Sequence, residues 1–207
     1  MMFVFRTAYA AAAGFAVLCI AVQSEAARMT QPRPQPGVEH DTDPPGGFIN
    51  FEMRYPNESR DGAPAFSQPA DIASARAIND TVNRNITWRE TRLWTIAPDE
   101  ASYGDCKTYA LTKRHDLLAE GVPQGAMRLV VVFAMHYRRL HMLLELRGTD
   151  GVYVLDSLPN ETGDAFYRAT AMPASYAVRE YQAWGRPEHW FAPNMLTAQS
   201  DGSDISY

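Results

Sequence analysis

The chain has 207 residues, of which 46% are hydrophobic and 21% charged, with a formal net charge of −5 and two cysteines. These proportions indicate a globular protein with one core rather than a disordered chain, because the apolar residues supply enough burial to offset chain entropy. Two cysteines are too few for a disulfide scaffold, and 19 Lys and Arg against 24 Asp and Glu argue against nucleic acid as a partner.

Residues 1–26 have the pattern of a secretory signal peptide. Arg6 precedes an apolar and small-residue stretch over 8–22, and the small-x-small sequence at 24–26 follows it. A stretch of about 15 residues is shorter than the roughly 20 that a transmembrane helix needs. The sequence therefore predicts export with cleavage after Ala26, and an uncleaved N-terminal anchor is the alternative.

The predicted cleavage changes the meaning of the cysteine count. Cys19 leaves with the signal peptide, so Cys106 becomes the one cysteine of the exported protein. Thiols in an exported protein are usually paired or oxidised. Cys106 is therefore an inert buried side chain, half of an intermolecular bridge, or a nucleophile.

The rest of the chain divides into a tether and one domain. Residues 27–47 are rich in Pro and Gly and show no hydrophobic periodicity, which predicts a flexible tether. Residues 48–207 contain no further linker or internal repeat, so they are predicted to form a single domain whose last residues, 199–207, are loose.

Two helices are predicted first within the domain. Apolar residues at helical spacing follow Asp71, a candidate N-cap, over residues 72–86. A second helix covers residues 106–120, with Asp105 as its candidate N-cap, and Gly121 followed by Pro123 ends it.

Three strands follow the helices. The continuous apolar run over 128–134 is typical of a central strand, and the segments 141–147 and 152–156 flank a Gly-Thr-Asp-Gly turn signal at 148–151. The aromatic-rich segment 165–190 is predicted to be mostly helical or irregular. Helices followed by a strand meander indicate an α+β domain in which a helix packs on an antiparallel sheet.

Cys106 is predicted to lie in the first turn of its helix. Free backbone N–H groups and the helix dipole stabilise an anion there, which favours the nucleophilic thiolate. A catalytic thiol also needs a base and a group that orients the base. If residues 149 and 150 form the hairpin turn, His141 and Asp156 lie diagonally on the same face of adjacent strands, within mutual reach. His136 is the competing candidate base.

Other kinds of site find less support. One cysteine with scattered histidines does not supply the ligand spacing of a zinc site, so no metal ligands are predicted. The sequence has neither a Gly-rich phosphate loop nor a G-x-S-x-G serine elbow. A side-chain oxyanion donor is expected from Trp94 or Asn83, with Tyr103 as a further option. The aromatic residues Tyr181, Trp184 and Trp190 are expected in the core rather than in a substrate groove.

These residues together resemble the bacterial transglutaminase-like cysteine proteinases, the family that includes the LapG-type periplasmic proteases. The similarity covers residues 70–158. It is carried by Ile78-Asn79, Val82-Asn83, Trp94 with Pro98-Asp99-Glu100, Gly104-Asp105-Cys106, Glu120-Gly121-Val122-Pro123, the strand 128–134, His141-Met142 and Val154-Leu155-Asp156-Ser157-Leu158.

The resemblance implies a papain-like, transglutaminase-type fold with Cys106 as nucleophile, His141 as general base and then acid, and Asp156 as its orienter. It also implies periplasmic proteolysis of protein or peptide substrates, which in LapG-type members releases surface adhesins. An inner-membrane regulatory receptor is a further partner that the resemblance implies.

The sequence departs from the family pattern directly after the cysteine. Relatives carry acidic residues of a calcium site there, whereas this chain has Lys107 and Thr108. An ammonium group stands where a dication needs carboxylate oxygens, so the sequence predicts no calcium at this position and no cofactor.

Three functions fit these observations. The first is a cysteine peptidase that hydrolyses an acyl-enzyme. The second is a transglutaminase-type acyltransferase in which an amine intercepts the same intermediate, and the third is a non-catalytic protein-binding domain on the same fold.

Overall fold

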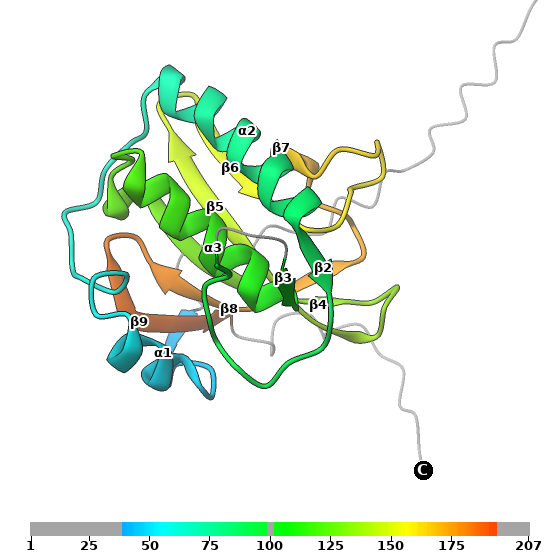
Figure 1. The fold of residues 1–207 in the computed structure, drawn as a ribbon, viewed down its shortest axis with the longest axis horizontal. Coiled ribbons are helices and arrows are strands. Elements are labelled where there is room, and N and C mark those ends of the chain that lie inside the picture. The colour runs from blue at the N-terminus through cyan, green and yellow to red at the C-terminus, as the bar shows by residue number, and fades with distance from the viewer. Residues whose placement is uncertain (1–38, 99–101, 194–207) are drawn as a thin grey trace, which may run out of the picture. The chain divides into compact units, whose positions relative to one another are not determined.

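The computed structural model describes residues 39–98 and 102–193, which form a mixed α+β fold (Figure 1). Its centre is a seven-stranded sheet with two helices packed on one face. The predicted signal peptide and the segment 199–207 lie outside the described residues. In the described part of the chain, no helix combines the length and apolar character needed to cross a membrane.

The helices and strands are as follows. The α-helices are α1 (Phe48–Arg54), α2 (Pro69–Asn85) and α3 (Cys106–Ala119), and short 3-10 turns cover Gln124–Ala126 and Ala169–Ala171. The strands are β1 (Glu39–Thr42), β2 (Ile86–Trp88), β3 (Ser102–Gly104), β4 (Met127–Ala134), β5 (Arg139–Gly148), β6 (Gly151–Leu155), β7 (Phe166–Arg168), β8 (Tyr176–Ala183) and β9 (Arg186–Pro193).

Helix α3 begins and ends where the sequence predicts. Asp105 is its N-cap and accepts a hydrogen bond from the backbone N–H of Lys107 at 3.1 Å. At the other end, Gly121 adopts a φ of 84°, which a residue with a Cβ rarely does, and the Val122 N–H bonds back to Leu117. The N-cap at Asp105 makes Cys106 the first residue of the helix.

The large sheet has the order β1-β9-β8-β4-β5-β6-β7, and β2 and β3 form a separate parallel pair. Strand β4 pairs antiparallel with β5 and with β8, so it is central, as its apolar run predicts. Its side chains alternate between two cores. Leu129 and Val131 face the cluster that includes α3, and Val130 and Val132 face the cluster on the other side of the sheet.

The β5–β6 hairpin has the predicted register. Gly148 pairs with Gly151 and Leu144 with Leu155, so residues 149 and 150 form the turn. The register brings the start of β5 beside the end of β6. His141 and Asp156 therefore come together at one end of the sheet.

Three predictions about elements were wrong. Residues 39–42 of the supposed tether form β1, which pairs with β9 in the sheet. The segment 165–190 is mainly strand, because its aromatic residues pair across β8 and β9 instead of following a helical period. Asp71 is not the N-cap of α2: Gln68 is, and the Asp71 carboxylate accepts the Gln68 N–H at 2.7 Å in a capping box.

The aromatic residues near the C-terminus belong largely to the interior, as expected. Tyr181 and Trp190 are buried, and the Trp190 ring lies 5.3 Å from the ring of Phe48 in α1. Trp184 is half-buried and stacks beneath Arg128 and Arg147. These side chains stabilise the sheet.

Candidate active site

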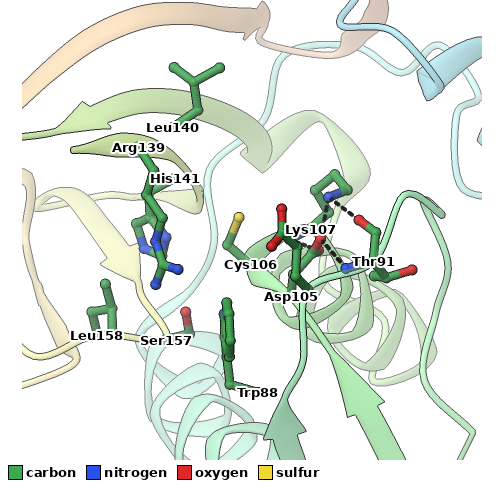
Figure 2. A pocket seen from close by; sticks show the side chains of 11 residues that line it. Trp88, Thr91, Asp105, Cys106, Lys107, Arg139, Leu140, His141, Ser157 and Leu158 are labelled. Carbon is green, nitrogen blue, oxygen red and sulfur yellow. Dashed lines mark hydrogen bonds and ion pairs between the residues drawn. The ribbon is translucent and has the colours of Figure 1, made fainter. Parts of the chain in front are cut away.

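A pocket of about 350 Å³ opens at the N-terminal end of α3. Its walls come from the end of β2 and the following loop, the start of α3, the start of β5 and the residues after β6. The lining residues are Trp88, Glu90, Thr91, Asp105, Cys106, Lys107, Arg139, Leu140, His141, Ser157 and Leu158. Two of the predicted triad residues, Cys106 and His141, are thus in one cavity, and Figure 2 shows them across the pocket from each other.

Cys106 is a half-buried free thiol at the first position of α3. The backbone N–H groups of the first helical turn have no partners within the helix, and they give this end of the helix a positive potential. A thiolate or an oxyanion beside Cys106 is stabilised by both features.

Asp105 and Lys107 form a closed ion pair beside the thiol (Figure 2). The Asp105 carboxylate also accepts the backbone N–H of Thr91 at 3.3 Å, and the Lys107 ammonium donates to the Thr91 carbonyl oxygen at 3.2 Å. The pair ties the loop after β2 to the start of α3. Because Lys107 neutralises the N-cap carboxylate, the negative charge of Asp105 opposes a neighbouring thiolate less strongly.

His141 and Asp156 are joined by a short hydrogen bond. His141 Nε2 lies 2.6 Å from Asp156 Oδ1, and the residues are 3% and 0% exposed, respectively. With Nε2 committed to the carboxylate, Nδ1 is the ring nitrogen left for proton exchange in the pocket. This is the geometry of a base held by an orienting carboxylate.

The rest of the Asp156 carboxylate is also fully occupied. Oδ1 accepts the Leu158 N–H at 2.9 Å, and Oδ2 accepts the hydroxyls of Tyr167 at 2.8 Å and Tyr176 at 3.3 Å. Burial and the Asp156 charge raise the pKa of both tyrosines, so both remain donors. Sequence reasoning missed these two residues, because they lie on strands that it had predicted as helical or irregular.

The environment of His141 favours its charged form. Burial alone lowers its pKa, but hydrogen bonding and charge interactions with Asp156 and with Cys106 outweigh burial and raise the pKa from 6.5 to about 9. Near neutral pH the imidazole is therefore an imidazolium facing the thiol. A thiolate–imidazolium pair is the reactive state of a cysteine nucleophile.

This raised pKa predicts a pH-dependent stability. The His141 contribution to the free energy of unfolding is complete below about pH 6.5 and is lost as the pH rises through about 9, because the folded state binds the proton more tightly. His141→Gln keeps an N–H donor but does not titrate. Urea unfolding of both proteins from pH 6 to 10 should show the difference between them shrinking across this window, and a constant difference would contradict the assignment.

The two expected oxyanion side chains are not among the residues that line the pocket. Trp94 is buried against Phe48, with ring centroids 5.6 Å apart, and belongs to the core. The Asn83 amide donates to the backbone oxygen of Asp156 at 2.8 Å. Tyr103 is exposed and stacks with Arg89. The tryptophan that lines the pocket is Trp88, which the family motif did not single out.

The other histidines are placed apart from Cys106. His136 lies in the turn between β4 and β5 and does not line the pocket, so the competing base is not favoured. His115 lies in the C-terminal half of α3, where its Nδ1 is 2.7 Å from the Glu58 carboxylate. His40 and His189 lie on β1 and β9.

Sequence comparison matches residues 38–198 to the family described as bacterial transglutaminase-like cysteine proteinase BTLCP. The chain belongs to this family. The predicted resemblance is therefore confirmed, and membership makes the protein a cysteine peptidase that acts on proteins or peptides. A search of curated proteins found no match.

Solved structures of Legionella pneumophila LapG are similar to this chain. The calcium-bound and EGTA-treated forms each share 20% sequence identity with it at a TM-score of 0.41. The matches cover 54% of this chain, and 70% and 68% of the respective LapG chains. The α+β, transglutaminase-type fold predicted from the sequence agrees with the family and with the antiparallel seven-stranded sheet and the helices of the structure.

The calcium-bound LapG structure contradicts the prediction of no cofactor, which rested on Lys107 and Thr108, and that prediction is withdrawn. Within the described residues, no group of three His, Cys, Asp or Glu side chains is arranged to hold a metal, and the Asp105 and Thr91 oxygens are bonded to Lys107. Asp99 and Glu100 lie outside the described residues.

Proposed function

We propose that the protein hydrolyses peptide bonds through an acyl-enzyme on Cys106, with His141 as acid and base and Asp156 as its orienter. The observation that carries the proposal is the hydrogen bond between His141 Nε2 and Asp156 Oδ1, beside the pocket that His141 shares with Cys106. A buried carboxylate, an imidazole and a thiol at a helix N-terminus are the parts that a cysteine nucleophile requires.

The first half of the reaction forms a thioester. Cys106 Sγ attacks the peptide carbonyl carbon, and the carbonyl oxygen becomes an oxyanion. His141 Nδ1–H then donates its proton to the leaving nitrogen as the C–N bond breaks, which releases an amine and leaves the acyl group on sulfur. Asp156 keeps Nε2–H engaged, so that Nδ1 stays directed into the pocket throughout.

The second half of the reaction hydrolyses the thioester and regenerates the free enzyme. Neutral His141 takes a proton from water, the resulting hydroxide equivalent attacks the thioester carbon, and the C–S bond breaks to release a carboxylic acid and the thiolate. The backbone N–H of Cys106, at the first position of α3, is one oxyanion donor in both halves. Neither Trp94 nor Asn83 is assigned this role.

The walls of the pocket are suited to a polypeptide. Trp88 and Leu140 line it with half or more of their surface exposed, and in Figure 2 Cys106 and His141 lie between them. Exposed apolar side chains beside reactive groups are typical of a substrate surface. This surface supports an extended peptide segment as the substrate.

Cleavage in water enriched in oxygen-18 tests the proposal directly. Hydrolysis of the acyl-enzyme places the heavy oxygen in the new C-terminal carboxylate, and mass spectrometry of products from a periplasmic protein extract detects it. The expected result is labelled new C-termini that require Cys106. Amine conjugates without new termini, when a biotinylated amine is present, would support the transglutaminase-type reaction instead, and neither product would support a non-catalytic binding domain.

We also propose that the protein acts after export. The apolar stretch over 8–22 and the small-x-small sequence at 24–26 support cleavage after Ala26. Protein recovered from the periplasm is expected to begin at Ala27. A chain that retains Met1 and stays in the cytoplasm would contradict export without affecting the proposed chemistry.

A further inference from the structure

Lys113 is a fully buried cation behind the proposed triad. It lies on α3 seven residues after Cys106, which is about two helical turns along the same face. Its side chain has 0% exposure, and its Nζ lies 2.8 Å from the backbone oxygen of Asp156. Lysine is almost never buried without a partner, because a charge loses its hydration inside a protein.

Several hydrogen bonds hold the backbone of Asp156 in place. The carbonyl oxygen that Lys113 binds also accepts the Asn83 amide of α2 at 2.8 Å, and the Asp156 N–H bonds the Ala165 carbonyl at 2.9 Å. Helices α2 and α3 thus both hold the peptide group that follows β6. The orientation of the Asp156 carboxylate, and through it that of His141, depends on this peptide group.

We propose that Lys113 is a positioning residue, which holds the Asp156 backbone so that its carboxylate orients His141 toward Cys106. This inference rests on the proposed function. Lys113 touches neither substrate nor the reacting atoms, and it lines no part of the pocket. It acts only through Asp156.

The charged and titratable groups around Lys113 agree with this role. Asp156 faces it from the end of β6, Asp80 from α2, and the Tyr109 ring lies 5.8 Å from Nζ on its own helix. Burial lowers the pKa of Lys113 to about 7, against the opposing effects of Asp156 and Asp80. The side chain donates a hydrogen bond in either protonation state, so the contact with Asp156 persists across neutral pH.

Because its pKa is about 7, Lys113 is largely uncharged near pH 9, where His141 titrates, so substitutions of Lys113 act there through its hydrogen bond to Asp156. Lys113→Met removes this donor, and looser Asp156 geometry lowers the His141 pKa. Lys113→Gln keeps an N–H donor. The Met variant is therefore expected to lower the His141 pKa, and the Gln variant to restore most of it.

The pH dependence of Cys106 alkylation by iodoacetamide, measured on the Cys106 peptide by mass spectrometry, tests this without a known substrate. In the wild-type protein, the rate of Cys106 alkylation should change in a step near pH 9, where His141 loses its proton. Lys113→Met should move this step down by about one pH unit, and Lys113→Gln should keep it nearer the wild-type position. Leu118→Ala, on the same helix and away from the pocket, controls for lost stability and should leave the step unmoved.

The outcomes separate the two hypotheses. An unmoved step or an upward shift in Lys113→Met, or an equal downward shift in Leu118→Ala, would overturn the positioning role. If native wild-type Cys106 reacts with the same pH dependence as the urea-unfolded chain, the proposed function itself fails. That second result involves no Lys113 variant, so the two failures are distinguishable.

Discussion

Cys106→Ala is expected to abolish peptide cleavage while leaving the fold intact. Removing an enzyme nucleophile lowers turnover on the order of 10⁵- to 10⁶-fold. Cys106 is half-buried and makes no disulfide, and alanine is a good helix former, so the start of α3 tolerates the change. Cleavage products quantified by mass spectrometry give the activity, and circular dichroism with thermal unfolding checks the fold.

Leu118→Ala is the matched control, since it truncates another side chain of α3 that does not line the pocket and should retain turnover. Turnover that survives in a folded Cys106→Ala protein would mean that the thiol is inert. Catalysis would then come from other groups, and the mechanism based on Cys106 would be wrong.

Asp156→Asn is expected to lower the rate constant for turnover by about 10³- to 10⁴-fold. The substitution removes the negative charge that stabilises the His141 imidazolium, and it places an amide NH₂ where the carboxylate accepts hydrogen bonds. Whichever way the amide turns, that NH₂ faces His141 Nε2–H and the Leu158 N–H, or the hydroxyls of Tyr167 and Tyr176. Steady-state kinetics on a cleaved peptide measure the loss.

Tyr167→Phe provides the graded comparison. It removes one neutral donor to the same carboxylate, which corresponds to about 1 kcal/mol and a rate loss of about tenfold or less. Equal losses of turnover in Asp156→Asn and Tyr167→Phe would show that the Asp156 charge has no specific role and that these side chains contribute only through packing. An Asp156→Asn protein that is folded and fully active would refute the orienting role.

The parts of the site set by local chemistry could be predicted from the sequence. The turn at 148–151 fixes the register of β5 and β6, and that register brings His141 to Asp156. Asp105 as N-cap fixes where α3 starts, and hence places Cys106 at its first position. Both depend on interactions within a few residues, which sequence patterns report well.

The parts set by distant contacts could not be predicted. The polar strand β1 is stable because β9 pairs with it, and its own four residues carry no strand pattern. Trp88 and Trp94 are six residues apart, yet one lines the pocket and the other packs on Phe48. Lys113 carries a helical spacing like that of a core residue, and its contact with Asp156 spans 43 residues. Only tertiary packing distinguishes these cases.

The most direct test of the central claim compares alkylation of Cys106 at pH 6 in the native and the urea-unfolded chain. An ordinary thiol with a pKa near 8.5 is almost entirely protonated at this pH and reacts slowly. The start of α3 and the His141 imidazolium both favour negative charge developing on the attacking sulfur, so the native protein is predicted to be labelled faster than the unfolded one. Labelling that appears only after unfolding would contradict the account.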